Sequence, residues 1–150
     1  MQQLNFPVLQ SQLRHKNNVA EVWDIVRKKW ILLTPEEWVR QHLIQYLHTE
    51  KGFSIGLMAV EKAIQFNGMM RRYDLVLYNQ QSQPVLLAEC KAPDIRITQQ
   101  VFDQAARYNL VMKVPYLLIT NGLEHYCSRI DFENSSFEFL REIPNRVEII

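Results

Sequence analysis

The sequence has little charge imbalance and no long hydrophobic run, and each absence excludes a class of protein. Its 150 residues carry 17 Lys and Arg against 16 Asp and Glu, and the net charge of +1 excludes a strongly basic, indiscriminate DNA-binding protein. No apolar run approaches the length of a membrane span, and the first residues lack the charged start and apolar core of a signal peptide. We therefore expect no membrane partner and a cytoplasmic location.

The sequence also lacks several informative motifs. Its two cysteines, Cys90 and Cys127, are too few for a disulfide framework and have no metal-binding spacing, which fits a reducing cytosol. It has no Gly-x-x-x-x-Gly-Lys-[Ser/Thr] phosphate-binding loop, and we therefore expect no nucleotide-driven motor of that kind. No recognition helix, zinc finger or extended basic arm is present, so nothing predicts that this chain reads bases.

What the sequence does have is the composition of a soluble globular domain. Hydrophobic residues make up 47% of the chain and charged residues 22%, and 150 residues are enough for one domain with its own core. We expect peripheral strands and turns over 1–33, a core over 34–140, and a tail over 141–150. The predicted fold class is α/β, with a mixed β-sheet core flanked by helices.

Two apolar stretches, residues 73–78 and 84–91, are typical of the strands of a central hairpin, because polar turn residues separate them. Side chains alternate between the faces of a strand, so Glu89 and Lys91 share one face. Symmetric closure of the hairpin places Asp74 opposite Glu89, with Cβ atoms ~4.5–5.5 Å apart. The pattern therefore predicts two carboxylates and a lysine together at one end of an apolar hairpin.

Two neighbouring carboxylates repel one another, and they call for a cation, a shared proton or solvent. A hard divalent cation such as Mg²⁺ suits such a pair, because it is held by one or two carboxylates together with phosphate and water. The alternative is a solvated strand end with a weak ion pair between Glu89 and Lys91. Under the first interpretation, removing either carboxylate leaves the fold unharmed, whereas a structural ion pair predicts a loss of stability.

A helix is predicted to begin at Thr34, since this residue suits the N-cap, Pro35 suits the first helical position, and Glu37 completes a capping box. Its end is expected near Gly52. Its predicted buried stripe consists of Val39, Leu43, Tyr46 and Leu47. Glu36 lies close to that stripe, whereas Glu37 points away from it. We therefore expect Glu36 to approach the acidic hairpin end, the alternative being a first-turn carboxylate that only favours the helix dipole.

A second helix is predicted from Thr98 to about Met112, with Val101, Ala105 and Leu110 on its apolar face. Gln104 and Tyr108 lie four residues apart and share a face of this helix. A strand over 116–120 follows, and a right-handed crossover makes it the parallel neighbour of the strand that carries Glu89. Further strands are expected over 13–16, 19–23, 55–66, 125–130 and 137–140, with turns at Asn17-Asn18 and Asn67-Gly68.

Two parts of the N-terminal region are left open by the sequence. Residues 24–30 fit either a turn or a helical fragment. The basic clusters over 14–16 and 27–29 either border a track for phosphates or are ordinary solvated surface.

Asp74 followed by Glu89-Cys90-Lys91 resembles the PD-(D/E)xK nuclease motif. Four blocks, residues 34–41, 71–74, 89–93 and 116–122, are together similar to the N-terminal nuclease domain of type I restriction enzyme R (motor) subunits. The similarity runs from about residue 13 to residue 122, which is most of the chain. The resemblance implies a restriction-endonuclease-like fold and a metal-dependent DNA endonuclease that hydrolyses phosphodiester bonds.

The resemblance also implies roles for individual residues. Asp74, Glu89 and the backbone carbonyl of Cys90 would hold Mg²⁺ (or Mn²⁺), Glu36 would complete the site, and Lys91 would assist catalysis. DNA binding or support of the site would come from Gln104, Tyr108 and Arg72. The implied partners are DNA and the motor and specificity subunits of a restriction system, with homo-oligomerisation left open. The alternative is a catalytically silent nuclease-fold module that binds DNA or protein, or dimerises.

Overall fold

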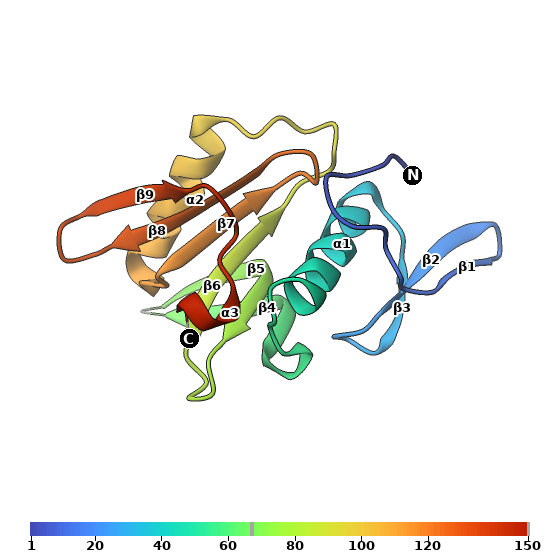
Figure 1. The fold of residues 1–150 in the computed structure, drawn as a ribbon, viewed down its shortest axis with the longest axis horizontal. Coiled ribbons are helices and arrows are strands. Elements are labelled where there is room, and N and C mark those ends of the chain that lie inside the picture. The colour runs from blue at the N-terminus through green and yellow to red at the C-terminus, as the bar shows by residue number, and fades with distance from the viewer. Residues whose placement is uncertain (67, 150) are drawn as a thin grey trace.

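The computed structural model describes residues 1–66 and 68–149, which form two β-sheets and several helices (Figure 1). The larger sheet has six strands in the order β4-β5-β6-β7-β8-β9. Neighbouring strands are antiparallel except β6 and β7, which are parallel as the predicted crossover requires. The strands are β4 (Met58–Phe66), β5 (Met69–Tyr78), β6 (Pro84–Cys90), β7 (Tyr116–Thr120), β8 (His125–Asp131) and β9 (Ser136–Leu140).

The smaller sheet is built from the N-terminal residues and consists of β1 (Leu13–Lys16), β2 (Val19–Asp24) and β3 (Lys29–Leu32). The predicted turn at Asn17 and Asn18 is confirmed, with φ of 53° and 63°, as a two-residue hairpin turn requires. The segment that the sequence left undecided is a turn in which Lys28 has φ of 53°, and β3 follows it.

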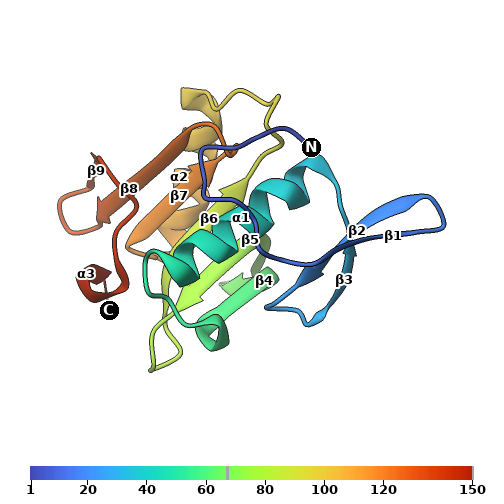
Figure 2. The same ribbon diagram turned by 45° about the vertical axis from the view of Figure 1, so that its right-hand side comes forward.

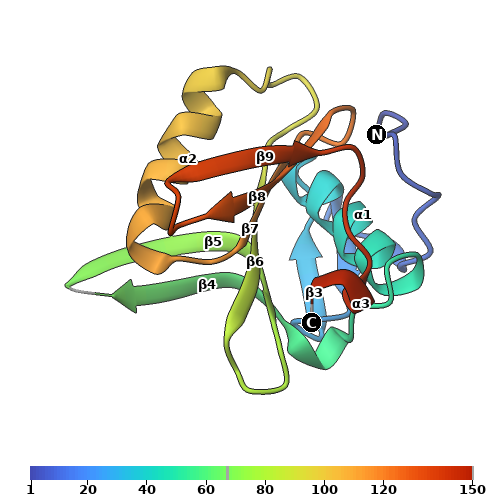
Figure 3. The same cartoon turned by 60° about the vertical axis from the view of Figure 1, so that its left-hand side comes forward.

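The two long helices cover opposite faces of the larger sheet (Figures 1 and 3). The helix α1 (Pro35–Thr49) packs on one face against Leu75, Leu77, Leu86 and Leu118, and the helix α2 (Gln99–Met112) packs on the other against Val76, Leu87, Leu117 and Ile119. Both predicted caps are confirmed, since Thr34 Oγ1 accepts from the Glu37 backbone N–H at 3.1 Å and Thr98 Oγ1 from that of Val101 at 3.3 Å. Alternate apolar residues along the strands thus face opposite sides of the sheet, and they form one core with α1 and a second core with α2.

The chain before β1 crosses the outer side of α1 (Figure 2). The Gln10 backbone N–H donates to Gln45 Oε1 at 2.6 Å, and the Trp38 indole donates to the Gln2 carbonyl at 2.9 Å. Polar residues of α1 such as Gln45 are therefore buried, and the helix is enclosed on more sides than its apolar stripe predicts.

The hairpin of β5 and β6 keeps the predicted register along most of its length. Leu75 pairs with Ala88 and Leu77 with Leu86, as symmetric closure requires. The register then shifts by one residue, so that Tyr78 pairs with Pro84 and not with Val85. The shift is confined to the turn end and leaves the acidic end of the hairpin as predicted.

Two other expectations about the elements need correction, and a third lies partly outside the described residues. Leu110 is 62% exposed, and the buried residues of α2 are Phe102, Ala105 and Asn109, whose amide bonds the Val114 backbone at 2.8 and 3.0 Å. The strand expected from residue 55 begins at Met58, after the short 3-10 helix η1 (Ile55–Leu57). In the predicted Asn67-Gly68 turn, Gly68 has φ of 77°, and Asn67 lies outside the described residues.

The residues after β9 are not a free tail. Ile143 is only 5% exposed, and the short helix α3 (Arg146–Ile149) contacts the loop after α1 through a hydrogen bond from the Arg146 backbone N–H to the Lys51 carbonyl at 2.9 Å. None of the helices in the described part of the chain is long and apolar enough to cross a membrane.

Candidate active site

The predicted acidic residues lie where β5 and β6 separate. Pairing between these strands ends at Leu75 and Ala88, after which β5 stays with β4 and β6 continues along β7 to the pair Cys90 and Thr120. The far part of the β4–β5 hairpin consequently projects from the body of the sheet (Figure 3). Asp74 directly precedes Leu75, the last β5 residue that pairs with β6. Glu89 directly follows Ala88, the last β6 residue that pairs with β5.

Asp74 is held at this fork by two hydrogen bonds. Its Oδ2 accepts from the Cys90 backbone N–H at 2.6 Å, and its Oδ1 accepts from Arg40 Nη2 of α1 at 2.9 Å. The first bond attaches Asp74 to the residue next to Glu89, as the predicted register implies. The carboxylate is 19% exposed and therefore remains accessible.

The predicted shared face of Asp74 and Glu89 is wrong. Glu89 faces α2, whereas Asp74 contacts α1. The reason is a break in the strand alternation, since Tyr73 packs with the core beneath α2 although simple alternation assigns it to the α1 side. In β4, Glu61 lies across from Asp74 in the strand register and has φ of 52°, a conformation unusual for a side-chain-bearing residue.

Glu89 is largely buried and is paired with an arginine from the projecting hairpin. Its Oε1 accepts from Arg71 Nη2 at 3.0 Å, and its side chain is 12% exposed. Burial raises the pKa of Glu89, and the nearby charge of Asp74 raises it further, whereas Arg71 and Lys91 lower it. The two carboxylates therefore interact electrostatically across the fork, as the sequence predicted.

The residues around Glu89 form a pocket of about 220 Å³ between the sheet and α2. Arg71, Lys91 and Gln104 supply its polar groups, so Gln104 comes to the site as predicted. Tyr108 reaches the same region through Arg71, whose guanidinium carbon lies 4.0 Å from the centroid of the Tyr108 ring. Arg72 is exposed on β5 and does not line this pocket, and its role in DNA binding stays a prediction.

Glu36 approaches the acidic residues from the first turn of α1. Its Oε1 accepts from Arg40 Nη2 at 3.2 Å, and its side chain is 46% exposed. Burial raises the pKa of Glu36, and the nearby Asp74 raises it further, while Arg40 and Lys91 lower it. Arg40 thus links the carboxylates of Glu36 and Asp74.

The expectation for Glu37 is wrong. Its side chain is 6% exposed and faces inward, where it accepts from Arg40 Nη1 at 2.6 Å and from Gln41 Nε2 at 2.8 Å, and it pairs with Arg27. The Thr34 backbone N–H donates to the Leu32 carbonyl at 3.1 Å, so the expected return bond of the capping box is replaced. The N-terminal sheet covers this side of α1 and supplies Arg27 as a partner for Glu37. The periodicity of the helix alone cannot reveal such a partner.

The roles of Arg27 and Arg71 are what sequence reasoning missed. Arg27, which belongs to a cluster considered for phosphate binding, instead pairs with Asp24 at 2.7 Å and with Glu61 at 3.2 Å, besides Glu37. Arg40 differs from these two, because its spacing of four residues from Glu36 already pointed to it in the sequence. Arg71 gave no such signal, because its partner Glu89 lies 18 residues away.

The oxygen donors at the fork fit Mg²⁺, with a small protein ligand set. Within residues 1–66 and 68–149, no three His, Cys, Asp or Glu side chains are grouped to hold one metal ion. Asp74, Glu89 and the Cys90 carbonyl offer two carboxylates and one neutral oxygen, and Mg²⁺ commonly takes its remaining ligands from water and substrate phosphates. Burial, and then the charge of Asp74, raises the pKa of Glu89, and a cation bound to its carboxylate would favour the ionised form.

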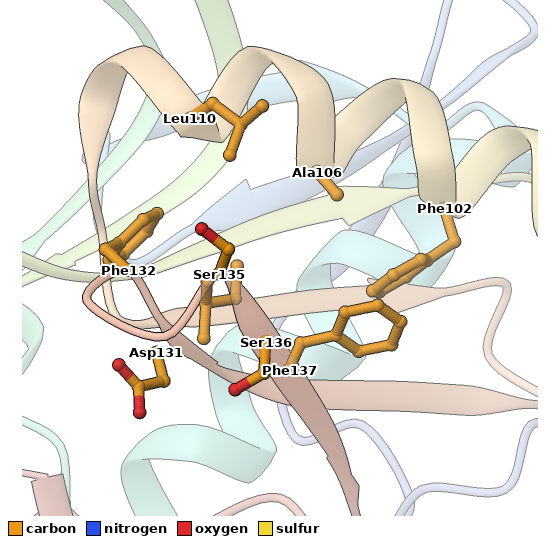
Figure 4. A pocket seen from close by; sticks show the side chains of 9 residues that line it. Phe102, Ala106, Leu110, Asp131, Phe132, Ser135, Ser136 and Phe137 are labelled. Carbon is orange, nitrogen blue, oxygen red and sulfur yellow. The ribbon is translucent and has the colours of Figure 1, made fainter.

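A second pocket, of about 130 Å³, lies between α2 and the hairpin of β8 and β9 (Figure 4). Phe102, Leu110, Phe132 and Phe137 dominate its lining, and Asp131 is its sole titratable lining residue in the described chain. This pocket has no constellation for acid–base or metal chemistry, so the fork is the candidate active site.

Comparisons with known proteins identify a family and a similar fold. A family described as the type I restriction enzyme R protein N terminus matches residues 35–144. The fold is similar to the fragment structure of a protein from Vibrio vulnificus YJ016 assigned as an HsdR subunit of a type I restriction enzyme, with a TM-score of 0.56 and 20% sequence identity. That similarity covers 78% of this chain and 24% of the Vibrio chain, so this chain spans about a quarter of its relative. No curated protein matches the sequence significantly.

Proposed function

Because this chain belongs to the family of type I restriction enzyme R protein N termini, we propose that it is a Mg²⁺-dependent DNA endonuclease domain of the PD-(D/E)xK type. One observation carries the proposal. Asp74 and Glu89 flank the point where β5 and β6 separate, Lys91 lines the pocket beside Glu89, and the pKa of Glu89 is raised by burial and by the charge of Asp74. Clustered carboxylates with perturbed pKa values are typical of sites that bind metal or transfer protons.

Each residue then has a task at the scissile phosphate. Asp74, Glu89 and the Cys90 carbonyl would hold Mg²⁺ (or Mn²⁺), with Glu36 close by on α1. The bound cation would lower the pKa of a water and neutralise charge on the phosphate. Lys91 lines the pocket beside Glu89, where it would orient the attacking water or stabilise the developing negative charge.

The remaining assignments concern DNA and other subunits. Gln104 and Tyr108 would support the site from α2, and Arg72 would contact the DNA backbone from the exposed side of β5. Motor and specificity subunits of a restriction system would supply translocation and target choice in the cytoplasm.

The test is cleavage of supercoiled and linear plasmid in the presence of Mg²⁺ or Mn²⁺, with EDTA as the metal-free control. We expect nicked and linear products from the wild type, and Asp74→Ala and Lys91→Ala to cut at least about 100-fold more slowly. Arg129→Met is the matched control, because Arg129 pairs with Glu138 on the remote β8–β9 hairpin. Equal cleavage rates for Asp74→Ala and the wild type would contradict the proposal.

A catalytically silent module that binds DNA or protein is the second candidate. The observation in its favour is that each site carboxylate already has an arginine partner, Arg40 for Asp74 and Arg71 for Glu89. Titration calorimetry with Mg²⁺ and Mn²⁺ separates the two candidates. DNA retention without divalent-cation binding favours the silent module, and cation binding that Asp74→Ala abolishes favours the nuclease.

A further inference from the structure

Arg71 is positioned between two groups that sequence reasoning assigned to the site separately. Its Nη2 donates to Glu89 Oε1 at 3.0 Å, and its guanidinium carbon lies 4.0 Å from the centroid of the Tyr108 ring. Arg71 comes from the projecting part of the β4–β5 hairpin, Glu89 from the end of β6, and Tyr108 from α2. Arg71 therefore connects β5, β6 and α2 beside the residues that would hold the metal.

The hydrogen bonding of Arg71 is incomplete. In the described part of the chain its buried Nε has no partner, although the side chain is 23% exposed and lines the pocket with Lys91 and Gln104. An arginine guanidinium offers five donors in a flat fork that matches a phosphate as well as a carboxylate. The donors that Glu89 leaves unused are suited to an anionic ligand in the pocket.

We propose that Arg71 is the counter-ion of Glu89 that a divalent cation must displace, and that the displaced guanidinium then binds a DNA backbone phosphate. Tyr108 acts through the face of its ring, which keeps the guanidinium at the pocket when its bond to Glu89 is released. This inference rests on the proposed function and names two positioning residues for it.

Charge and geometry explain why the exchange is feasible. A cation bound to Glu89 repels a guanidinium on the same carboxylate, while a phosphate next to the cation attracts it. Contact with the ring stabilises the guanidinium without occupying any of its N–H groups, so Arg71 remains free to change its anionic partner. A purely structural ion pair predicts instead that Arg71 orders Glu89 and thereby strengthens metal binding.

The first measurement is Mg²⁺ binding to the full chain by calorimetry, without DNA. We expect Arg71→Met to bind Mg²⁺ about two- to fivefold more tightly than the wild type, because a partly exposed competing ion pair is lost. Lys91→Met is the matched control, since it removes one positive charge from the same pocket but no bond to Glu89. Arg71→Met binding no more tightly than Lys91→Met, or more weakly than the wild type, would overturn the inference.

The second measurement is the dependence of cleavage on DNA concentration. We expect Arg71→Met to raise KM for DNA about tenfold or more, because a phosphate contact is lost. Tyr108→Leu removes the ring and should shift towards Arg71→Met in both measurements, whereas Tyr108→Phe keeps the ring and should shift clearly less. Equal defects in Tyr108→Phe and Tyr108→Leu would assign the role to the hydroxyl and contradict the proposal.

The two failures are distinguishable. A wild-type chain that binds no divalent cation and cuts no DNA removes the proposed function, and this inference with it. A wild-type chain that does both, with Arg71→Met unchanged in both, removes this inference alone. Thermal melts of each variant identify a folding defect. If Arg71→Met unfolds, Tyr108→Leu still tests the contact between the Arg71 guanidinium and the Tyr108 ring.

Discussion

At the scale of single residues, the site is organised by charge compensation. Asp74 pairs with Arg40, Glu89 with Arg71, and the fully buried Asp24 with Arg27. Burying a carboxylate without a partner would cost several kcal/mol. Asp74 and Glu89 were predictable from the strand pattern, but their partners Arg40 and Arg71 lie on other elements, and only the folded chain brings them together.

Glu89→Gln and Asp74→Asn are expected to change stability in opposite directions. The folded-state pKa of Glu89 is raised, so its ionisation opposes folding as pH rises above the unfolded value. At pH 7, Glu89→Gln should therefore be as stable as the wild type, or up to about 1 kcal/mol more stable. Asp74→Asn weakens a charge-assisted bond to the buried Arg40 and should lose about 1–3 kcal/mol.

Urea unfolding at pH 7 and at pH 4 tests this pair of expectations. The gain from Glu89→Gln should shrink as the pH falls, because the wild-type carboxyl is then protonated in the folded state. Equal effects of the two substitutions would contradict the separate environments described for Asp74 and Glu89. The sequence had predicted that either carboxylate could be removed without harm, and the Arg40 contact now restricts this expectation to Glu89.

At the scale of elements, the regular patterns were predictable and their interruptions were not. Thr34 and Thr98 gave the starts of both long helices, and the apolar runs gave the central hairpin and its parallel neighbour. The face of Asp74 was not predicted correctly, because the alternation of β5 is interrupted at Tyr73, which packs with the core beneath α2. A two-residue period cannot signal such an interruption, since the arginine that Asp74 contacts lies on another element, α1.

The first turn of α1 separates a structural carboxylate from a candidate site carboxylate. Glu37→Gln should lower the free energy of unfolding by about 3 kcal/mol, because its side chain is 6% exposed and lies between Arg27 and Arg40. Glu36→Gln should change it by less than about 1 kcal/mol, since Glu36 is 46% exposed. Chemical denaturation measures both.

The metal dependence of the same two variants should show the reverse order. Glu36→Gln should weaken Mg²⁺ binding measured by calorimetry, because it removes a negative charge that interacts with Asp74. Glu37→Gln should retain Mg²⁺ binding under conditions where it is folded. Loss of metal binding in Glu37→Gln alone would reassign the helix carboxylate of the site.

At the scale of the whole molecule, the N-terminal sheet supports the candidate site although it lies outside the family match over residues 35–144. Arg27 joins β2 to α1 through Asp24 and Glu37, and Glu37 in turn contacts Arg40, which holds Asp74. The sequence predicted residues 1–33 as a peripheral part of a single domain. This series of ion pairs connects residues 1–33 to Asp74 in the site.

Arg27→Met should therefore destabilise the entire chain and disturb the fork, whereas Arg14→Met should do neither. Arg27 is 13% exposed and neutralises carboxylates on three elements, so its loss leaves buried negative charge and should cost about 3 kcal/mol or more. Arg14 contacts Glu21 and the Trp30 ring within the same small sheet and is 37% exposed, so its loss should cost about 1 kcal/mol or less.

Hydrogen exchange of the amides around Cys90 reports on the fork directly, since the Cys90 N–H is protected by its bond to Asp74. Arg27→Met should speed exchange at Cys90 more than at Leu118 in the centre of the sheet, because Arg40 then holds Asp74 less firmly. A uniform acceleration at both amides would mean that Arg27 contributes only to global stability. If Arg27→Met changes neither the exchange rates nor the melting temperature, the N-terminal sheet does not support the site, and the rest of the chain forms the site without it.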